Sequence, residues 1–329
     1  MEVLILNGNE VQGLLSMEEV IEYVEKAFKE KGENRVQMPP KIYLYFERYK
    51  GDLRAMPAYL NSLDIAGIKI VNSHPNNKGK GLPTVMAVIE LVDPKSGSPL
   101  AIMDGTLITS FRTGASSAVA TKYLANEEAH ILGIVGAGAQ ALPQISAISK
   151  VRKIEEIRIF DIDRRASDGL ALQLKESGID SVIIDEDLRI LAENSDIIST
   201  LTPSREPILF DGWVKEGTHV NAIGADAPGK QELDPNILKK SKIIVDDLEQ
   251  TVHSGEINVP ISQGILLKEE IYGELGEIVA GKKLGRTSKS EITVFDSTGL
   301  AILDVITAYY IYRKAVEKGI GKTLQLIIP

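Results

Sequence analysis

The stretch GIVGAGAQA, residues 133–141, follows an apolar run and leads into a helical pattern. It places Gly136, Gly138 and Ala141 in the order G-x-G-x-x-A. In a strand–loop–helix unit the first glycine permits a tight turn and the second lets the backbone approach a phosphate. The small third residue allows close packing of helix on strand. A glycine-rich turn that binds nothing is the alternative interpretation, and the flanking strand and helix argue against it.

A carboxylate lies at the end of the next predicted strand. Asp161 closes the segment EEIRIFD, where an acid accepts hydrogen bonds from the ribose hydroxyls of an adenosine. The loop and the acid together predict a dinucleotide site, with the pyrophosphate at the positive end of a helix. Asp161 favours NAD over NADP, because it would repel a 2′-phosphate. Arg164 favours the opposite choice, since an arginine there can bind that phosphate.

The chain outside the loop predicts an α/β fold with two domains. From His130 onward strands and helices alternate, which is typical of a Rossmann-type doubly wound parallel sheet, here residues 127–298. Before it, an amphipathic helix ends at Gly32, with Ser16 and Glu19 at capping-box spacing. Consecutive strands between Lys41 and residue 104 predict an antiparallel or mixed sheet. We expect the last helix, about 299–318, to return to this α+β domain, which comprises 1–126 and 299–329.

Composition excludes several classes of function. The formal charge is −9 over 329 residues, and no cluster of Lys and Arg favours nucleic acid as a partner. The sequence has no apolar run of membrane-spanning length and an acid near its N-terminus, so we expect a cytoplasmic chain without membrane contact. Cysteine is absent and the four histidines are scattered, so thiol catalysis is excluded and no metal site is expected.

One lysine stands out in an apolar strand. In GIKIV, residues 67–71, the two-residue period puts Lys69 on the opposite face from Ile68 and Ile70. The ordinary interpretation is a solvated lysine on the wet face of a half-buried strand. The functional interpretation is a positioned acid or base.

Several strings, taken together, resemble the ornithine cyclodeaminase/μ-crystallin family, and most closely its archaeal alanine dehydrogenase branch. They span nearly the whole chain in family order, whereas a glycine loop alone is shared by many folds. The strings are MPPK (38–41), DLRAMPA (52–58), KIVNSHP (69–75), GLPTVMA (81–87), SFRTGA (110–115), GAGAQA (136–141), NAIGADAPGKQEL (221–233) and FDSTGLA (295–301).

The resemblance implies a homodimer in which the N-terminal sheet and the last helix form the substrate and dimerisation domain, with the nicotinamide reaching the cleft between domains. It implies that Lys69 touches the substrate, that Asp226 relays protons and that Lys41 faces the substrate carboxylate. Arg112 is expected to hold cofactor phosphate. The other implied NAD contacts are Thr84, Gly136, Gly138, Ala139, Gln140, Asp161, Ile162, Asp163, Thr202, Ala222, Ile223, Gly224, Lys230 and Ser297. Asp226 has an alternative interpretation as the N-cap of a short helix near Pro235.

One departure from the family bears on the substrate. Where ornithine cyclodeaminases have a glutamate suited to a second ammonium, this chain has Arg54, which would repel that ammonium and attract a carboxylate. The expected reaction is therefore NAD-dependent oxidative deamination of L-alanine to pyruvate and ammonia. The alternatives are cyclodeamination of ornithine to proline, reduction of a cyclic imine, and a non-catalytic dinucleotide-binding protein like μ-crystallin.

Overall fold

The computed structural model describes residues 2–77 and 80–327, and the chain divides into two compact units. The first unit comprises Met1–Arg112 and Leu300–Pro329, and the second comprises Thr113–Gly299. The division falls inside helix α3 (Thr106–Leu124), whereas the sequence prediction placed it after residue 126. Arg112 contacts Asp304 of the first unit, while the Thr113 carbonyl accepts a hydrogen bond from Gln144 of the second.

The first unit is built on a mixed sheet, as the consecutive strands predicted. Its strand order is β16-β1-β7-β6-β5-β4-β2, with β3 paired to β4. Among the described strands of this sheet, β1 and β7 form the one parallel pair, and the other pairs are antiparallel. The strands are β1 (Glu2–Leu6), β2 (Val36–Gln37), β3 (Ile42–Phe46), β4 (Gly51–Leu60), β5 (Ile65–Ser73), β6 (Val85–Val92), β7 (Pro99–Asp104) and β16 (Lys322–Gln325). The helices are α1 (Gly8–Leu14), α2 (Met17–Gly32) and α11 (Ala301–Lys318).

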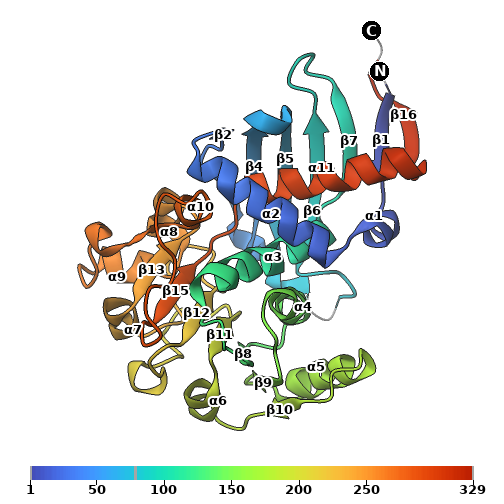
Figure 1. The fold of residues 1–329 in the computed structure, drawn as a ribbon. Coiled ribbons are helices and arrows are strands. Elements are labelled where there is room, and N and C mark those ends of the chain that lie inside the picture. Colours follow the sequence, from blue (N-terminus) through green and yellow to red (C-terminus); the bar gives the residue numbers. More distant parts are fainter. Residues whose placement is uncertain (1, 78–79, 328–329) are drawn as a thin grey trace. The chain divides into compact units, whose positions relative to one another are not determined.

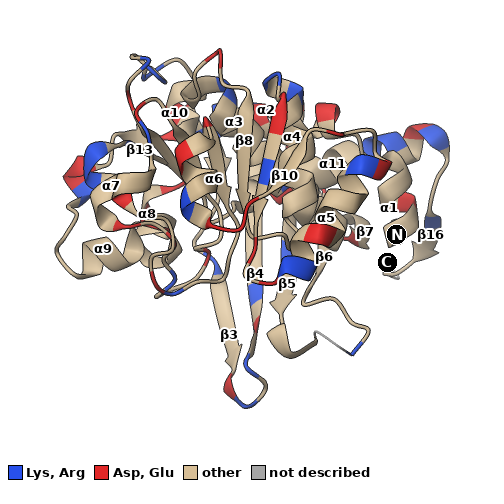
Figure 2. Ribbon diagram, turned by 90° about the horizontal axis from the view of Figure 1, so that it is seen from below, with Lys and Arg blue, Asp and Glu red and all other residues tan. Residues whose placement is uncertain are grey.

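Helix α11 crosses one face of this sheet and packs on β4, β5, β6 and α2 (Figure 1). The last helix therefore belongs to the first unit. The hairpin of β3 and β4 extends beyond the other strands, with charged residues at its tip (Figure 2).

Helix α2 begins after Ser16 and buries the predicted apolar stripe, which includes Val20, Val24 and Phe28. The predicted capping box is wrong. The Ser16 side chain makes no cap hydrogen bond, and the Glu19 carboxylate accepts hydrogen bonds from Tyr310 and Lys314 on α11 instead. A tertiary contact with two donors has replaced the local one.

The second unit is the predicted doubly wound sheet. All of its paired strands run parallel, in the order β10-β9-β8-β11-β12-β15-β13-β14. The strands are β8 (Ile131–Val135), β9 (Glu156–Phe160), β10 (Val182–Ile184), β11 (Ile197–Thr200), β12 (His219–Ala222), β13 (Lys242–Val245), β14 (Gly273–Glu274) and β15 (Thr293–Asp296). The helices are α4 (Ala141–Val151), α5 (Arg164–Glu176), α6 (Leu188–Asn194), α7 (Pro235–Lys240), α8 (Leu248–Ser254), α9 (Asn258–Ser262) and α10 (Leu275–Val279).

Strand order reverses next to β8, because β9 and β10 extend the sheet on one side and β11 and β12 on the other. Ligands of open α/β sheets bind at such a switch point, beyond the carboxyl ends of the strands. Two buried apolar clusters cover the strands of this sheet. One contains Ala141, Ile145 and Leu170 from α4 and α5, and the other contains Leu191 and Ile237 from α6 and α7.

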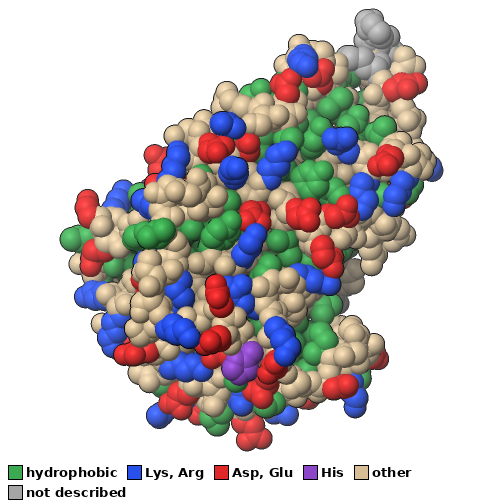
Figure 3. Space-filling view, viewed as in Figure 1, with side chains coloured by type: hydrophobic (Ala, Val, Ile, Leu, Met, Phe, Trp, Pro, Cys, Tyr) green, Lys and Arg blue, Asp and Glu red, His purple; other side chains and the backbone are tan. Residues whose placement is uncertain are grey.

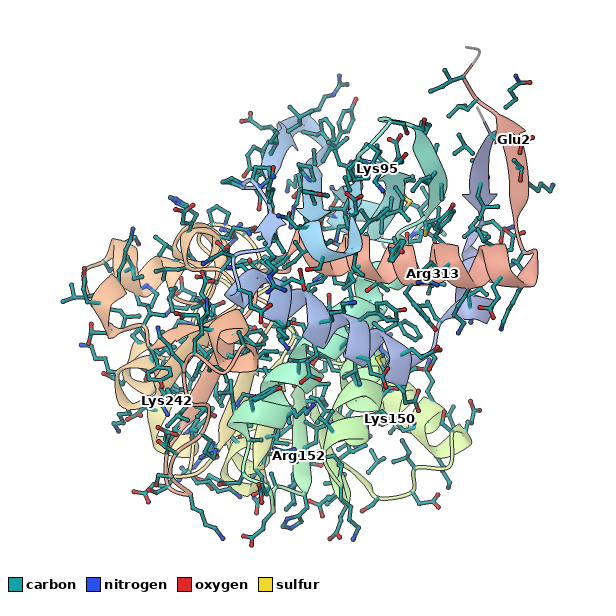
Figure 4. All side chains as sticks on the ribbon, turned by 45° about the horizontal axis from the view of Figure 1, so that its top comes forward. Glu2, Lys95, Lys150, Arg152, Lys242 and Arg313 are labelled. Atoms are coloured by element: carbon teal, nitrogen blue, oxygen red, sulfur yellow. The ribbon has the colours of Figure 1, made fainter. Side chains whose placement is uncertain are left out.

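Two arginines hold the C-terminal end of α3 in the second unit. Arg152, labelled in Figure 4, donates hydrogen bonds to the carbonyls of Lys122 and Ala125, and Arg286 donates to that of Leu124. Guanidinium donors satisfy carbonyls that the helix leaves unpaired and offset the negative end of its dipole.

The surface shows no dominant charge on the face drawn in Figure 3, where Lys and Arg side chains are interspersed with Asp and Glu. Among residues 2–77 and 80–327, no helix has the length and apolar character needed to span a bilayer.

Candidate functional site

The glycine loop has the geometry that its sequence predicts. Gly136 follows β8 with φ of +100°, a conformation that side chains disfavour, and a Cβ there would lie 3.1 Å from Cγ2 of Thr202. A Cβ on Gly138 would meet no atom within 4 Å. The protein itself thus does not require glycine at 138, whereas a phosphate approaching the backbone would. Ala139 and Gln140 complete the turn into α4, and Ala141 is fully buried.

Asp161 follows β9 and touches the same loop. One carboxylate oxygen accepts a hydrogen bond from the Ala137 backbone amide at 2.8 Å, and the other accepts one from the Asp163 amide at 2.8 Å. A carboxylate has about four acceptor positions, so these bonds fix Asp161 without exhausting it. Ile162 is exposed and Asp163 caps α5. Arg164 forms an ion pair with Asp168 at 3.1 Å.

Buried carboxylates that the sequence prediction missed hold the neighbouring strand ends. Glu232 accepts hydrogen bonds from the amide and hydroxyl of Thr202, both at 2.7 Å, and from the Gly224 amide at 3.0 Å. Ala222 and Ile223 precede Gly224 and are buried. Glu232 lies in the string GKQEL, but a buried acid that binds only its own chain leaves no distinctive sequence signal.

The loop after β15 is fixed in the same way. Asp246 accepts hydrogen bonds from the Ser297 hydroxyl at 3.1 Å and from the amides of Thr298 and Gly299 at 2.7 and 2.8 Å. The predicted cofactor contacts of the second unit thus lie at or just after the carboxyl ends of β8, β9, β11, β12 and β15, which share one edge of the parallel sheet.

Asp226 lies beyond β12 at this same edge. Its side chain accepts a hydrogen bond from Lys230 Nζ at 2.5 Å and is 37 % exposed. The N-cap interpretation is excluded, because Asp234 caps α7 by accepting a hydrogen bond from the Asn236 amide. Asp226 is therefore paired with Lys230 in the loop that follows β12, and it does not cap a helix.

In the first unit, β5 buries Lys69 and exposes the neighbouring Ile70. Lys69 is 1 % exposed while Ile70 is 41 % exposed, so the solvated-lysine interpretation is wrong. Lys69 lies opposite the buried residues Met56 on β4 and Ile89 on β6, on the face that α11 covers.

Three charged side chains of the first unit meet on that face. Lys69 Nζ donates to Asp304 Oδ1 at 2.8 Å, and Arg112 Nε donates to the same oxygen at 2.9 Å. The Thr109 hydroxyl is 3.4 Å from Lys69 Nζ. The structure thus brings Lys69 and Arg112 together through Asp304, a residue that the sequence prediction missed.

The pKa of Lys69 is lowered from 10.5 to about 7. Loss of hydration is the main cause, the charges of Arg112 and Lys41 lower the pKa further, and the Asp304 carboxylate opposes them. Near neutral pH both protonation states of this lysine are populated, as a group that exchanges protons with a substrate requires.

The remaining predicted residues of the first unit are Lys41, Arg54 and Thr84. Lys41 precedes β3, and its charge acts on Lys69. Arg54 on β4 binds Asp52 through Nε and Nη2 at 3.1 and 3.0 Å and lies over the Tyr43 ring. Thr84 is exposed just before β6, where its carbonyl accepts a hydrogen bond from the His74 amide at 2.7 Å.

No group of three or more His, Cys, Asp or Glu side chains among the described residues could hold a metal ion. The cations of the first unit and the glycine loop of the second instead suit carboxylate and phosphate groups.

These features define a two-unit α/β protein with a Rossmann-type sheet. The model of the ornithine cyclodeaminase/mu-crystallin family matches residues 1–319, and this chain belongs to that family. An alanine dehydrogenase from Archaeoglobus fulgidus is 49% identical over 325 residues, covering 99% of each chain.

Two solved structures extend the comparison. An archaeal alanine dehydrogenase dimer with bound NAD has a TM-score of 0.95 and 49% identity, covering 99% of this chain and 100% of its own. Delta(1)-pyrroline-2-carboxylate reductase from Thermococcus litoralis, in complex with NADH and L-proline, has a TM-score of 0.94 and 42% identity, covering 97% and 99%.

Proposed function

We propose that this protein is an NAD-dependent amino-acid dehydrogenase that converts L-alanine, NAD⁺ and water into pyruvate, ammonium, NADH and a proton. The observation that carries the proposal is Lys69, a buried lysine with a pKa of about 7 beside two further cations. A solvated or purely structural lysine has no need of such a site.

The residues present fit NAD. Gly136 and Gly138 would receive the pyrophosphate, Asp161 the adenosine ribose, and Arg112 a phosphate oxygen. Ala139, Gln140, Ile162, Asp163, Thr202, Ala222, Ile223, Gly224, Lys230, Ser297 and Thr84 complete the proposed contacts. When bound, NAD⁺ supplies the acceptor for the hydride that leaves the substrate Cα.

Lys69 in its neutral form accepts a proton from the substrate ammonium, and the amine lone pair then assists departure of hydride from Cα. Asp226 accepts a proton from the water that adds to the resulting iminium carbon. Asp226 then releases this proton to solvent. Return of the proton from Lys69 to nitrogen makes ammonia the leaving group, and as the C–N bond breaks Asp226 accepts the proton of the carbinol hydroxyl, which leaves the 2-oxo acid; the ammonia departs with this proton as ammonium. The reverse reaction, reductive amination, uses the protonated lysine.

The substrate side chain is proposed from the charges around Lys69. Lys41 and Arg54 suit the substrate carboxylate, and Asp52 fixes the plane of the Arg54 guanidinium. A diamino acid would bring a second ammonium toward these cations, which disfavours ornithine. A small side chain such as the methyl group of alanine fits better.

A second candidate is reduction of a cyclic imine to L-proline. It is favoured by the similarity to the Thermococcus litoralis reductase, and the protonated Lys69 would serve it equally well as a proton donor.

We also propose a homodimer formed through the outer face of the first sheet. Ile42, Ala55, Ile70 and Val88 lie directly opposite one another across β3, β4, β5 and β6. Ile42 is 61 % exposed and Val88 is 50 % exposed, and a row of exposed apolar side chains is typical of an interface. The dimeric state of the archaeal alanine dehydrogenase supports this proposal.

A spectrophotometric assay of NADH formation with L-alanine, L-ornithine and L-proline in separate reactions tests the function. We expect oxidation of alanine, with pyruvate and ammonia as products. Turnover of proline alone would identify a cyclic-imine reductase. Formation of proline and ammonia from ornithine, without turnover of alanine, would overturn the proposal.

A further inference from the structure

Asp304 joins segments that lie far apart in the chain. It is fully buried on the first turn of α11, 235 residues from Lys69 and 192 from Arg112. Its Oδ1 accepts a hydrogen bond from each of these side chains, while Oδ2 is buried without a hydrogen-bond partner among the described residues. We propose that Asp304 is a positioning residue for the reaction, because this carboxylate fixes both the place and the charge of Lys69. The inference rests on the proposed function.

Stability alone does not account for this arrangement. Each buried charge loses its hydration, and two cations that share one carboxylate oxygen also repel each other. In proteins generally, replacing a buried ion pair or triad by apolar side chains of similar volume is often neutral or stabilising. The cluster is therefore better explained by the chemistry of Lys69 than by packing.

The sheet is shaped so that α11 can reach the lysine. A Cβ on Gly67 would lie 2.6 Å from the Glu90 carbonyl oxygen and 3.3 Å from Cγ2 of Val305, the residue after Asp304. Gly67 precedes Lys69 by two residues and shares its face of β5. The missing side chain admits the helix at the point where Asp304 meets Lys69.

Asp304 is the acidic group among the three charged side chains that act most strongly on Lys69. Arg112 from α3 and Lys41 before β3 both disfavour the ammonium. The strand neighbours opposite Lys69 on β4 and β6 are Met56 and Ile89, which carry no charge. Without the Asp304 anion, the ammonium would lose its shortest hydrogen bond while the repulsion remained. Lys69 would then be both displaced and easier to deprotonate.

The test is Asp304→Asn, which keeps the shape of the side chain and removes its charge. The matched control is Glu317→Gln, the same chemical change at an exposed position of α11, four residues after the Arg313 labelled in Figure 4. The first measurement is the pH dependence of alanine turnover. The second is NMR titration of Lys69 in ¹³C,¹⁵N-lysine-labelled full-length protein, assigned by its absence in Lys69→Met.

We expect Asp304→Asn to move the titration of Lys69 to lower pH by roughly one to three units, the usual effect of an opposite charge at close range. The pH profile of turnover should move in the same direction, and the maximal rate should fall about a hundredfold, as misplacement of a reacting group predicts. Glu317→Gln should leave both unchanged. Asp304→Glu, which restores the anion but not its position, should return the titration toward wild type while turnover stays low.

A Lys69 titration and a pH profile unchanged in Asp304→Asn would overturn the inference, because a purely structural role moves neither. If that variant fails to fold, Asp304→Glu decides: a folded variant with wild-type turnover shows that the position of the carboxylate is unimportant and refutes the role. The NMR titration needs no substrate. Suppose that the wild type does not oxidise alanine but its Lys69 titration still shifts in Asp304→Asn. This result would count against the proposed function, and it would still support control of the Lys69 charge by Asp304.

Discussion

Replacement of Lys69 by methionine should change how stability depends on pH. Burial lowers the pKa of this lysine from 10.5 to about 7, so the unfolded chain binds the proton more tightly than the folded chain. Below about pH 7 Lys69 is protonated in both the folded and the unfolded chain, and its buried charge lowers the stability of the fold by the full amount. This destabilisation is relieved as the pH rises from 7 to 10.5. The whole effect is on the order of 5 kcal/mol, at about 1.4 kcal/mol per pKa unit.

Lys69→Met keeps a similar volume but cannot titrate. It also removes a donor from Asp304, and that loss shifts stability by a nearly constant amount over this pH range. The signal is therefore the slope: wild type should gain stability from pH 7 toward pH 10.5 relative to the variant. The assay is the melting temperature at fixed protein and salt concentration, where several degrees of difference are expected.

The matched control is Lys95→Met, because Lys95 is an exposed lysine of the same unit, labelled in Figure 4. It should follow the wild-type pH dependence. In the same samples, Lys69→Met should reduce alanine turnover by roughly a hundred- to ten-thousand-fold and leave NADH binding nearly intact. Parallel stability profiles of wild type and Lys69→Met, or retention of more than about a tenth of the activity, would refute the reasoning.

Three further outcomes are expected. Asp161→Ser should relax the preference for NAD toward NADP, measured as the ratio of kcat/KM values, and a wild type that already uses NADP equally well would contradict this. Glu232→Gln should weaken NADH binding about tenfold in a fluorescence titration, because Thr202 or Gly224 loses a buried acceptor worth about 1–3 kcal/mol; an unchanged Kd would show that Glu232 does not shape the site. Ile70→Asp should convert dimers to monomers in light scattering, whereas a dimeric variant would place the interface elsewhere.

The sequence by itself determined the second unit and its glycine loop. The tight turn at Gly136, the open approach at Gly138 and the buried packing of Ala141 depend on a few neighbouring residues, so a short string specifies them. Buried parallel strands that alternate with helices are likewise a local pattern, and the sheet topology follows from few alternatives.

Tertiary structure alone decided which face of β5 is buried and what Lys69 contacts. The two-residue period placed Lys69 opposite its isoleucines, but a period does not say which face a distant helix will cover. Helix α11 covers the lysine face and brings Asp304 to it across 235 residues. The same limit explains Glu19, which Tyr310 and Lys314 on that helix bind in place of a capping box. A buried ion pair joins partners by proximity in the fold, and no spacing along the chain records it.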